Sequence, residues 1–400
     1  MQTREAPVAG AIRQHRACTR CILDAGDDPS ITFDDQGVCN HCRTYDEVSR
    51  AHLLPGEERG RRLAALLDEM KERGRGRDYD CVVGVSGGVD STYVAWLAKQ
   101  FGLRVLAVHC DNGWNSELAV KNIENIVRRL GFDLYTYVID WEEFRDLQLA
   151  YLKASVVDIE AITDHAILAS LFQVAVRHGI GYVLSGENIV TEGRLPSHWV
   201  HNKNDLLNIN AIHRRFGRVP LRTFPKLGFW RSLYYQKVAR IRYVPILDYV
   251  EYNKREAKRI IAEELGWRDY GGKHYESIFT RFYQSYILPN KFGIDKRRSH
   301  LSTLVCSGQL SRDEALALAE QEIIDPAMLE SDKSYVLKKF GLTSEAFEEI
   351  MSAPVRAHTE YASIDHLYAR LRPIRDRLRR VKWLLRRGGE RSGQRRYTNG

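Results

Sequence analysis

The 400-residue sequence has no apolar run near the roughly 18 residues that a membrane-spanning helix needs. Its first 20 residues contain no apolar core, so we expect no secretory signal and a cytoplasmic location. It also lacks an internal repeat, and no cysteine follows Met1 to serve as a glutaminase nucleophile. Apolar residues make up 44% and charged residues 28% of the chain, which is typical of a globular protein, and the length suggests two or three domains.

Excess charge is also nearly absent from most of the chain. The net charge is +8, but Arg370 to Gly400 alone hold 12 Lys/Arg and 2 Asp/Glu, which leaves 48 basic and 50 acidic residues elsewhere. A neutral body argues against a nucleic-acid partner, and we expect none. The basic tail, residues 366–400, alternates leucines with arginines around Pro373. This tail either makes a peripheral contact with an anionic membrane surface, that of the inner membrane, or is a solvated surface segment.

Cysteine is scarce, and its placement is uneven. Four of the seven cysteines form a C-x₂-C-x₁₇-C-x₂-C pattern, which lies within zinc-ribbon spacing: Cys18, Cys21, Cys39 and Cys42. Four thiolates close a tetrahedral shell, so we expect a structural zinc ion. His41 is an alternative fourth ligand. The other cysteines, Cys81, Cys110 and Cys306, make no pair in the sequence.

Strands and helices alternate from residue 79 onward. Strand candidates cover residues 81–85, 104–110, 134–139, 182–186 and 243–247, with helical segments between them. This order predicts an α/β fold with a mostly parallel, doubly wound sheet. We divide the chain into an N-terminal arm and zinc ribbon (1–54), the α/β domain (55–250), a helical substrate-binding region (251–365) and the basic tail (366–400).

The stretch "CVVGVSGGVDSTYVAWLAKQFG", residues 81–102, predicts an anion-binding loop. An apolar strand ends at Ser86-Gly87-Gly88, and a helix starts near Asp90 and Ser91. Free N–H groups and the macrodipole at a helix N-terminus favour a phosphate there, and glycines let it approach the backbone. The loop has neither the lysine of a Walker A motif nor the G-x-G-x-x-G fingerprint.

The segment "SGGVDS" resembles the PP-loop of the ATP pyrophosphatase superfamily, whose members cleave ATP between the α- and β-phosphates. The resemblance implies an adenine nucleotide alpha hydrolase-like fold and a loop that holds pyrophosphate. It assigns ATP contacts to Ser86, Gly87, Gly88, Asp90 and Ser91, and to the strand-end residues Asp111, Asn112, Gly186 and Glu187. It also assigns Mg²⁺ to Asp90.

Two PP-loop families carry a cysteine-paired N-terminal module. One comprises tRNA-thiolating enzymes, which commonly need further paired cysteines. The other comprises the N-acetyl sugar amidotransferases of lipopolysaccharide and nonulosonic-acid biosynthesis. The sequence resembles the second more closely, through "CNHC", "DNGWNSE", "TDHAI", "SGEN" and "YGGKHYESIFTRFYQSYILPNKFGIDKRRSHLS".

That resemblance implies ATP-dependent conversion of an acetamido group on a sugar nucleotide into an acetamidino group, with release of AMP and pyrophosphate. Ammonia would come from a separate glutaminase and a cyclase-like subunit. The tRNA-modifying function remains the alternative, and an ATP-binding protein without catalysis is a third.

Charged residues of the quoted segments supply the remaining site candidates. As catalytic residues we predict Asp90, Lys273, His274, Lys296 and Arg297. As substrate-binding residues we predict His165, Asn188, Glu192, Lys291 and Arg298. Arginine suits phosphate through its bidentate fork. The competing structural roles are a solvated charged loop for Lys291 to Arg298, helix capping near Asn188, and a packed histidine at position 165.

Overall fold

A five-stranded parallel sheet forms the centre of the computed structural model, which describes residues 16–193, 196–366 and 369–370. Its strands are β1 (Cys81–Gly84), β2 (Val105–Asp111), β3 (Asp133–Val138), β4 (Tyr182–Ser185) and β5 (Arg242–Pro245). They are ordered β3-β2-β1-β4-β5, with Val83 of β1 paired to Ala107 and Leu184. The predicted α/β class and all five strands are confirmed. The residue 1–15 arm and most of the basic tail lie outside the described residues.

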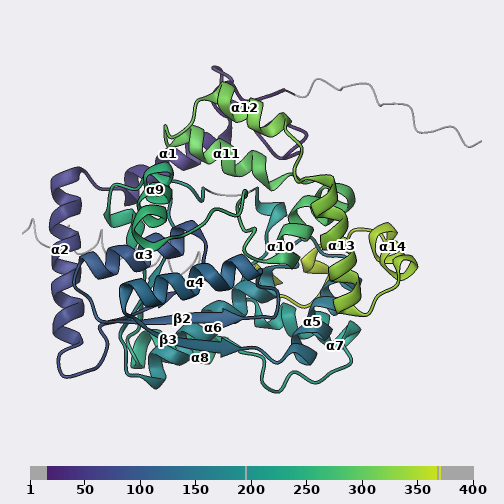
Figure 1. Ribbon diagram of the computed structural model, residues 1–400. Helices are drawn as coiled ribbons and strands as arrows, with labels where there is room; N and C mark the ends of the chain where they lie inside the picture. The colour runs from purple at the N-terminus through teal and green to yellow at the C-terminus, as the bar shows by residue number, and fades with distance from the viewer. Residues whose placement is uncertain (1–15, 194–195, 367–368, 371–400) are drawn as a thin grey trace, which may run out of the picture.

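Helices cover both faces of the sheet (Figure 1). On one face α3 (Val89–Gln100), α4 (Glu117–Leu130) and α9 (Lys254–Leu265) bury Val83 and Val85. On the other, α6 (Ala161–Arg177) packs against Val82, Leu106 and Val108. The strands are apolar on both faces, as the strands of a covered parallel sheet must be. Strand order reverses between β1 and β4, so the loop after β1 lies at a topological switch point, where ligands of such sheets bind.

Local sequence explains where the helices that border this loop begin and end. Ser116 caps α4 by accepting from the backbone N–H of Ala119, and Asn253 caps α9 by accepting from those of Arg255 and Glu256. Gly131 and Gly266 end the two helices in the left-handed conformation that glycine adopts without strain.

The remaining described elements are helical. They are α1 (Asn40–His52), α2 (Gly56–Arg73), α5 (Trp141–Ala154), η1 (Ser197–Trp199), α7 (Leu206–Phe216), α8 (Phe229–Leu233), η2 (Tyr234–Val238), η3 (Ile246–Tyr249), α10 (Ile278–Phe282), η4 (Tyr283–Phe292), α11 (Lys296–Cys306), α12 (Arg312–Glu320), α13 (Pro326–Phe340), α14 (Ser344–Ser352) and η5 (His358–Glu360). Within the described part of the chain, no helix combines the length and apolarity needed to cross a bilayer. The domain division remains a prediction, although α9 shares the core of the sheet.

The cysteine-rich N-terminal module packs on α11 and α12, far from it in sequence (Figure 1). Arg298 of α11 pairs with Asp24 and Asp27 at 2.9 and 2.7 Å. Arg312 of α12 donates to the carbonyl oxygens of Cys18 and Cys21. These contacts hold the module against α11, which also reaches the carboxyl ends of the strands.

Candidate active site

The loop between β1 and α3 has the shape of an anion-binding loop. Gly87 has φ +82°, which favours glycine, and its carbonyl accepts from the Trp267 indole and the Tyr270 hydroxyl, both at 2.7 Å. The Ser86 and Ser91 hydroxyl oxygens lie 3.1 Å apart, and the N–H of Gly88 donates to Ser86. The loop therefore presents hydroxyls and the N-terminus of α3 together. These positions fit the predicted phosphate contacts.

Two lysines from distant segments lie near this loop. Lys254, the first residue of α9, is 3.9 Å from the Asp90 carboxylate, which also accepts from the Tyr252 hydroxyl. Lys273 pairs with Glu192 at 3.1 Å. We call Lys254 and Lys273, with the carboxylates of Asp90, Glu192 and Glu276, the lysine cluster. Its cations can neutralise phosphate charge, and Asp90 fits a Mg²⁺ ion because Mg²⁺ takes carboxylate and phosphate oxygens.

The pKa values of Lys254 and Lys273 are shifted in opposite directions. Burial lowers the pKa of Lys254, although Asp90 opposes the shift. Burial also opposes the charge of Lys273, but Glu192 and Asp90 outweigh it and raise that pKa. Lys273 thus stays charged, whereas Lys254 is the more easily deprotonated of the pair.

Residue 276 brings the C-terminal region into direct contact with the loop. A Cβ placed on Gly88 would lie 3.3 Å from Oε1 of Glu276. Burial works against the charge of Glu276, but His274, whose Nδ1 is 3.6 Å away, and Lys273 lower its pKa. His274 itself has φ +62°, an uncommon backbone for a non-glycine residue. The predicted Lys273 and His274 therefore do lie beside the loop.

His300 of α11 completes this side of the site. Its Nδ1 is 3.0 Å from the carbonyl of Thr191, and burial, with Lys273 and Lys254 nearby, lowers its pKa well below the ordinary value. A neutral imidazole next to two lysines suits a hydrogen bond more than a charge contact.

The ends of β2 and β4 border the same edge. A Cβ on Gly186 would come within 3.0 Å of the backbone of Asp90 and Ser91, so only glycine lets the β4 loop approach α3 this closely. Burial raises the pKa of Glu187, which accepts from Tyr243 at 2.9 Å. Asp111 ends β2 and Asn112 follows it, and their side chains accept from the N–H groups of Gly113 and Trp114. Their roles in adenosine binding remain predictions.

Lys296 lies in a second polar cluster, not at the loop. Asp158 and Asp164 pair with Lys203 at 2.6 and 3.0 Å. Glu160, just before α6, accepts from the Thr280 hydroxyl at 2.7 Å. Lys296 lies within electrostatic range of all three carboxylates, and burial lowers its pKa. We call Asp158, Glu160 and Asp164, with Lys203 and Lys296, the carboxylate cluster.

Arg297 and Arg298, predicted as a catalytic and a substrate-binding residue, both have partners within the protein. Arg297 donates to Asp295 at its own helix start and to the carbonyls of Ala319 and Gln321. Arg298 pairs with Asp24 and Asp27. Both guanidinium groups are used to dock neighbouring segments.

Three predicted substrate contacts are also structural. Lys291 donates to the carbonyls of Ile350, Met351 and Ala353 at the end of α14. The Asn188 side chain accepts from the N–H and the hydroxyl of Thr191 and donates to the carbonyl of Gly186. All its hydrogen bonds are therefore made within one turn of the chain. His165 is fully buried between the carbonyl of Lys203 and the N–H of Leu227. The alternative stated for His165, a packed histidine, matches its contacts. Lys291 lies in η4 and not in a solvated loop, and Asn188 stabilises a turn and not a helix start.

The four predicted zinc ligands do converge. Their sulfur atoms lie within 4.8 Å of one another, with Cys18–Cys42 at 3.9 Å and Cys21–Cys39 at 3.8 Å. Zn–S bonds of about 2.3 Å in a tetrahedron place the sulfurs ~3.8 Å apart, so these thiols fit a zinc ion. His41 is not part of this converging group, and its Nε2 lies 2.8 Å from Asp28. The Cys306 sulfur, which no sequence pairing indicated, lies 3.5 Å from that of Cys42.

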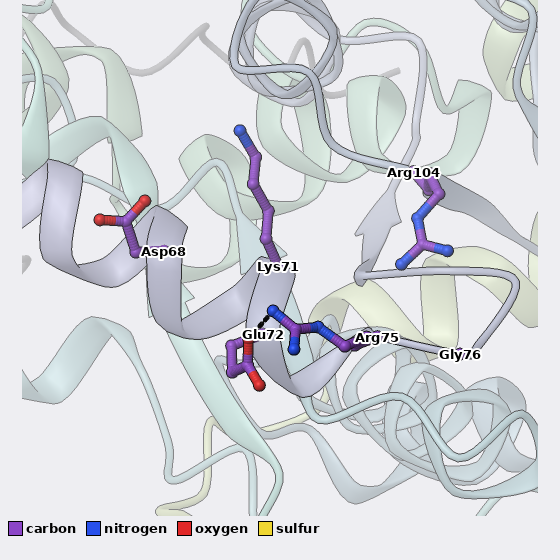
Figure 2. A pocket seen from close by; sticks show the side chains of 6 residues that line it. All are labelled: Asp68, Lys71, Glu72, Arg75, Gly76 and Arg104. Atoms are coloured by element: carbon purple, nitrogen blue, oxygen red, sulfur yellow. Dashed lines mark ion pairs between the residues drawn. The ribbon is translucent and has the colours of Figure 1, made fainter.

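A separate hollow, shown in Figure 2, lies near the amino ends of β1 and β2. It is lined by Asp68, Lys71, Glu72, Arg75, Gly76 and Arg104. The Glu72–Arg75 pair spans 2.6 Å with side chains 64% and 79% exposed, so it is a solvated surface pair. Arg104 precedes β2, whereas ligands of parallel sheets bind at the carboxyl ends. We assign this hollow no role in catalysis.

Two protein families match this chain, one over the PP-loop and one over the C-terminal region. Residues 80–208 match the family described as Queuosine biosynthesis protein QueC. Residues 276–375 match that described as LPS biosynthesis protein WbpG-like, C-terminal domain.

Two curated relatives match over short segments. A tRNA(Ile)-lysidine synthase of Chlamydia pneumoniae is 36% identical over 70 residues, 17% of this chain and 22% of that protein. A GMP synthase (glutamine-hydrolyzing) of Pyrobaculum aerophilum is 36% identical over 83 residues, 20% of this chain and 16% of that protein. The chain thus spans less than a quarter of either relative's length.

Two solved structures align with 72% of this chain and 98% of their own. They are the NH3-dependent NAD synthetase of Campylobacter jejuni, with a TM-score of 0.29 and 15% identity, and the NMN synthetase of Francisella tularensis, with 0.31 and 13%. The family matches cover the loop and the segment that contacts it. The chain therefore carries a QueC-like domain of the ATP-using PP-loop superfamily over residues 80–208 and a WbpG-like C-terminal domain over residues 276–375.

Proposed function

We propose that this protein is an ATP-dependent amidotransferase. It converts an acetamido group of a sugar nucleotide into an acetamidino group through an adenylated intermediate, in surface-polysaccharide biosynthesis. One observation carries the proposal: residues of the segment that matches the lipopolysaccharide family, Glu276 and His300, adjoin the PP-loop and its lysines. The substrate-specific part of the chain and the ATP-cleaving part therefore share one site.

The chemistry fits these groups. The oxygen of an amide is a poor leaving group, so it must first be activated. Its attack on the α-phosphate of ATP forms an O-adenylated imidate and releases pyrophosphate. The serine hydroxyls and the α3 N-terminus can hold the pyrophosphate, and Lys254 and Lys273 can neutralise its charge. Mg²⁺, held by Asp90, would supply further charge neutralisation.

Nitrogen enters in the second step. Ammonia adds to the imidate carbon, and the carbon–oxygen bond to AMP breaks, which leaves the amidine. A separate glutaminase and a cyclase-like subunit would supply the ammonia. The GMP synthase relative is a glutamine-hydrolyzing enzyme, which supports an amide-nitrogen reaction in this superfamily. The acetamido group must lie between ATP and ammonia, with water excluded.

The tRNA-thiolation alternative finds no support in the cysteines. Cys81 is fully buried, and burial raises the pKa of Cys110 to about 12, so neither thiol is poised as a nucleophile. Cys306 lies beside the four-cysteine cluster. No accessible cysteine pair is available near the PP-loop among the described residues.

The experiment is to incubate the zinc-loaded protein with Mg-ATP, ammonium chloride and a panel of N-acetylated sugar nucleotides, and to quantify nucleotides by chromatography. We expect equal amounts of AMP and pyrophosphate, and only when both the sugar nucleotide and ammonium are present. Formation of AMP with tRNA but with no sugar nucleotide would support the alternative instead.

A further inference from the structure

The carboxylate cluster contains buried polar atoms that nothing in the described protein satisfies. Oδ1 of Asp158, Oε1 of Glu160 and Oγ1 of Thr163 have no hydrogen-bond partner among the described residues. The three residues lie within six positions of one another, and their exposed fractions are 0%, 7% and 8%. Buried polar atoms without partners destabilise a fold, so three such atoms close in sequence call for a ligand that donates hydrogen bonds.

The unpartnered atoms of the cluster, and not its charge count, select the kind of ligand. Three carboxylates face two lysine ammonium groups, and Lys203 is already paired with Asp158 and Asp164. The unpartnered atoms are two carboxylate oxygens and a hydroxyl, and a carboxylate can only accept. A small monovalent cation with N–H donors in several directions satisfies both conditions.

The cluster is also close to the lysine cluster. Lys296 and His300 are four residues apart on α11, so they lie on one helix face, about 6 Å apart along the axis. Thr280, which donates to Glu160, follows Glu276 of the lysine cluster by four residues. One helix and one short segment thus connect the two clusters.

We propose that Asp158, Glu160 and Thr163 bind an ammonium ion and that Glu160 accepts its proton, which releases ammonia beside the adenylated substrate. This rests on the proposed function. In the step, one N–H bond of NH₄⁺ breaks and its proton moves to the carboxylate oxygen, which leaves NH₃ with its lone pair free to attack.

The groups around Glu160 support this division of roles. Burial raises the pKa of Glu160 to about 7, Asp164 adds to the shift, and Thr280, Lys296 and Lys203 oppose it. Burial acts on Asp158 as well, but Lys203 and Lys296 keep its pKa low. Asp158 therefore stays a charged acceptor, whereas Glu160 can take up a proton near neutral pH.

The test combines kinetics with direct detection of the cation. In AMP-release assays with varied ammonium chloride, Glu160→Gln should raise the KM for ammonium at least tenfold and leave the KM for ATP unchanged. Glu349→Gln, an exposed residue on α14, is the matched control. Thr163→Val is a second variant in case Glu160→Gln does not fold, and it should raise the same KM.

Crystals of the wild-type protein soaked in rubidium chloride give a readout independent of catalysis, since Rb⁺ is similar in size to ammonium. We expect an anomalous peak between Asp158, Glu160 and Thr163. Absence of that peak, or an unchanged ammonium KM in both variants, would overturn the inference. If the wild type forms no AMP with any acetamido sugar nucleotide, the proposed function fails, while the rubidium peak still decides whether the cation site exists.

Discussion

The lysine cluster and the carboxylate cluster differ in how their charges are satisfied. At the PP-loop, Lys273 pairs with Glu192, and Asp90 accepts from Tyr252. In the carboxylate cluster, two buried carboxylate oxygens have no partner among the described residues. The first cluster is suited to the charges of ATP and Mg²⁺, and the second to a small cation. Under the two proposals, one site binds an anionic reactant and a cationic one a short distance apart.

The largest effect should come from the lysine cluster. Asp90→Asn removes the carboxylate expected to hold Mg²⁺, so we expect kcat for AMP formation to fall on the order of 10³-fold. The fold should survive, because Asp90 is a partly exposed residue in the first turn of α3. Asp133→Asn, which alters only a surface contact with Tyr79, is the control. Activity within tenfold of wild type would remove Asp90 from the mechanism.

A smaller loss should follow removal of one cation from the same cluster. Lys273→Met leaves pyrophosphate less neutralised and Glu192 unpaired, so we expect about a 10²-fold fall in kcat/KM. Lys273→Arg should recover part of it because the charge returns. The comparison of the two variants in one pyrophosphate-release assay checks this. Equal activity of the Met and Arg variants would contradict a role for charge.

Loss of zinc should weaken both clusters together. The cysteine module holds α11 through Arg298, and α11 carries both Lys296 and His300. Cys39→Ser should therefore lower the metal content, and we expect about a tenfold fall in activity with a thermal midpoint lower by several degrees. Cys306→Ser should keep one zinc per chain by elemental analysis. Full activity in a metal-free Cys39→Ser protein would show that the module does not support the site.

The smallest change should be one of stability in the carboxylate cluster. Because the pKa of Glu160 is raised to about 7, the folded state favours its neutral form. That preference is fully present below the ordinary glutamate pKa of ~4.5 and is lost as pH rises through ~7.

Glu160→Gln should therefore match wild-type stability at pH 4 and exceed it by up to about 3 kcal/mol at pH 8. Urea unfolding in ammonium-free buffer at the two pH values measures the difference. A variant that is less stable than wild type at pH 8 would mean that Glu160 is charged and well satisfied.

Features encoded within one short segment could be predicted from the sequence. The five strands, the PP-loop and the four-cysteine cluster each depend on residues a few positions apart, or on a spacing with a known geometry. The caps at Asn253 and Gly266 belong to the same class.

Features assembled from distant segments could not be predicted. Lys254 and Tyr252 reach Asp90 only because α9 packs against α3, and Cys306 meets Cys42 only because α11 docks on the cysteine module. Arg298 looked like a phosphate ligand because its partners, Asp24 and Asp27, lie more than 270 residues away. The sequence did contain a signal for the carboxylate cluster, because Asp158 and Glu160 precede α6 and Asp164 lies in its first turn.

The central claim is that the acetamido oxygen attacks the α-phosphate of ATP. It is tested most directly with a sugar nucleotide whose acetamido carbonyl carries ¹⁸O, by mass spectrometry of the AMP formed. We expect each AMP to contain one ¹⁸O atom in its phosphate and pyrophosphate to contain none. Unlabelled AMP, or release of ADP and orthophosphate in its place, would contradict it.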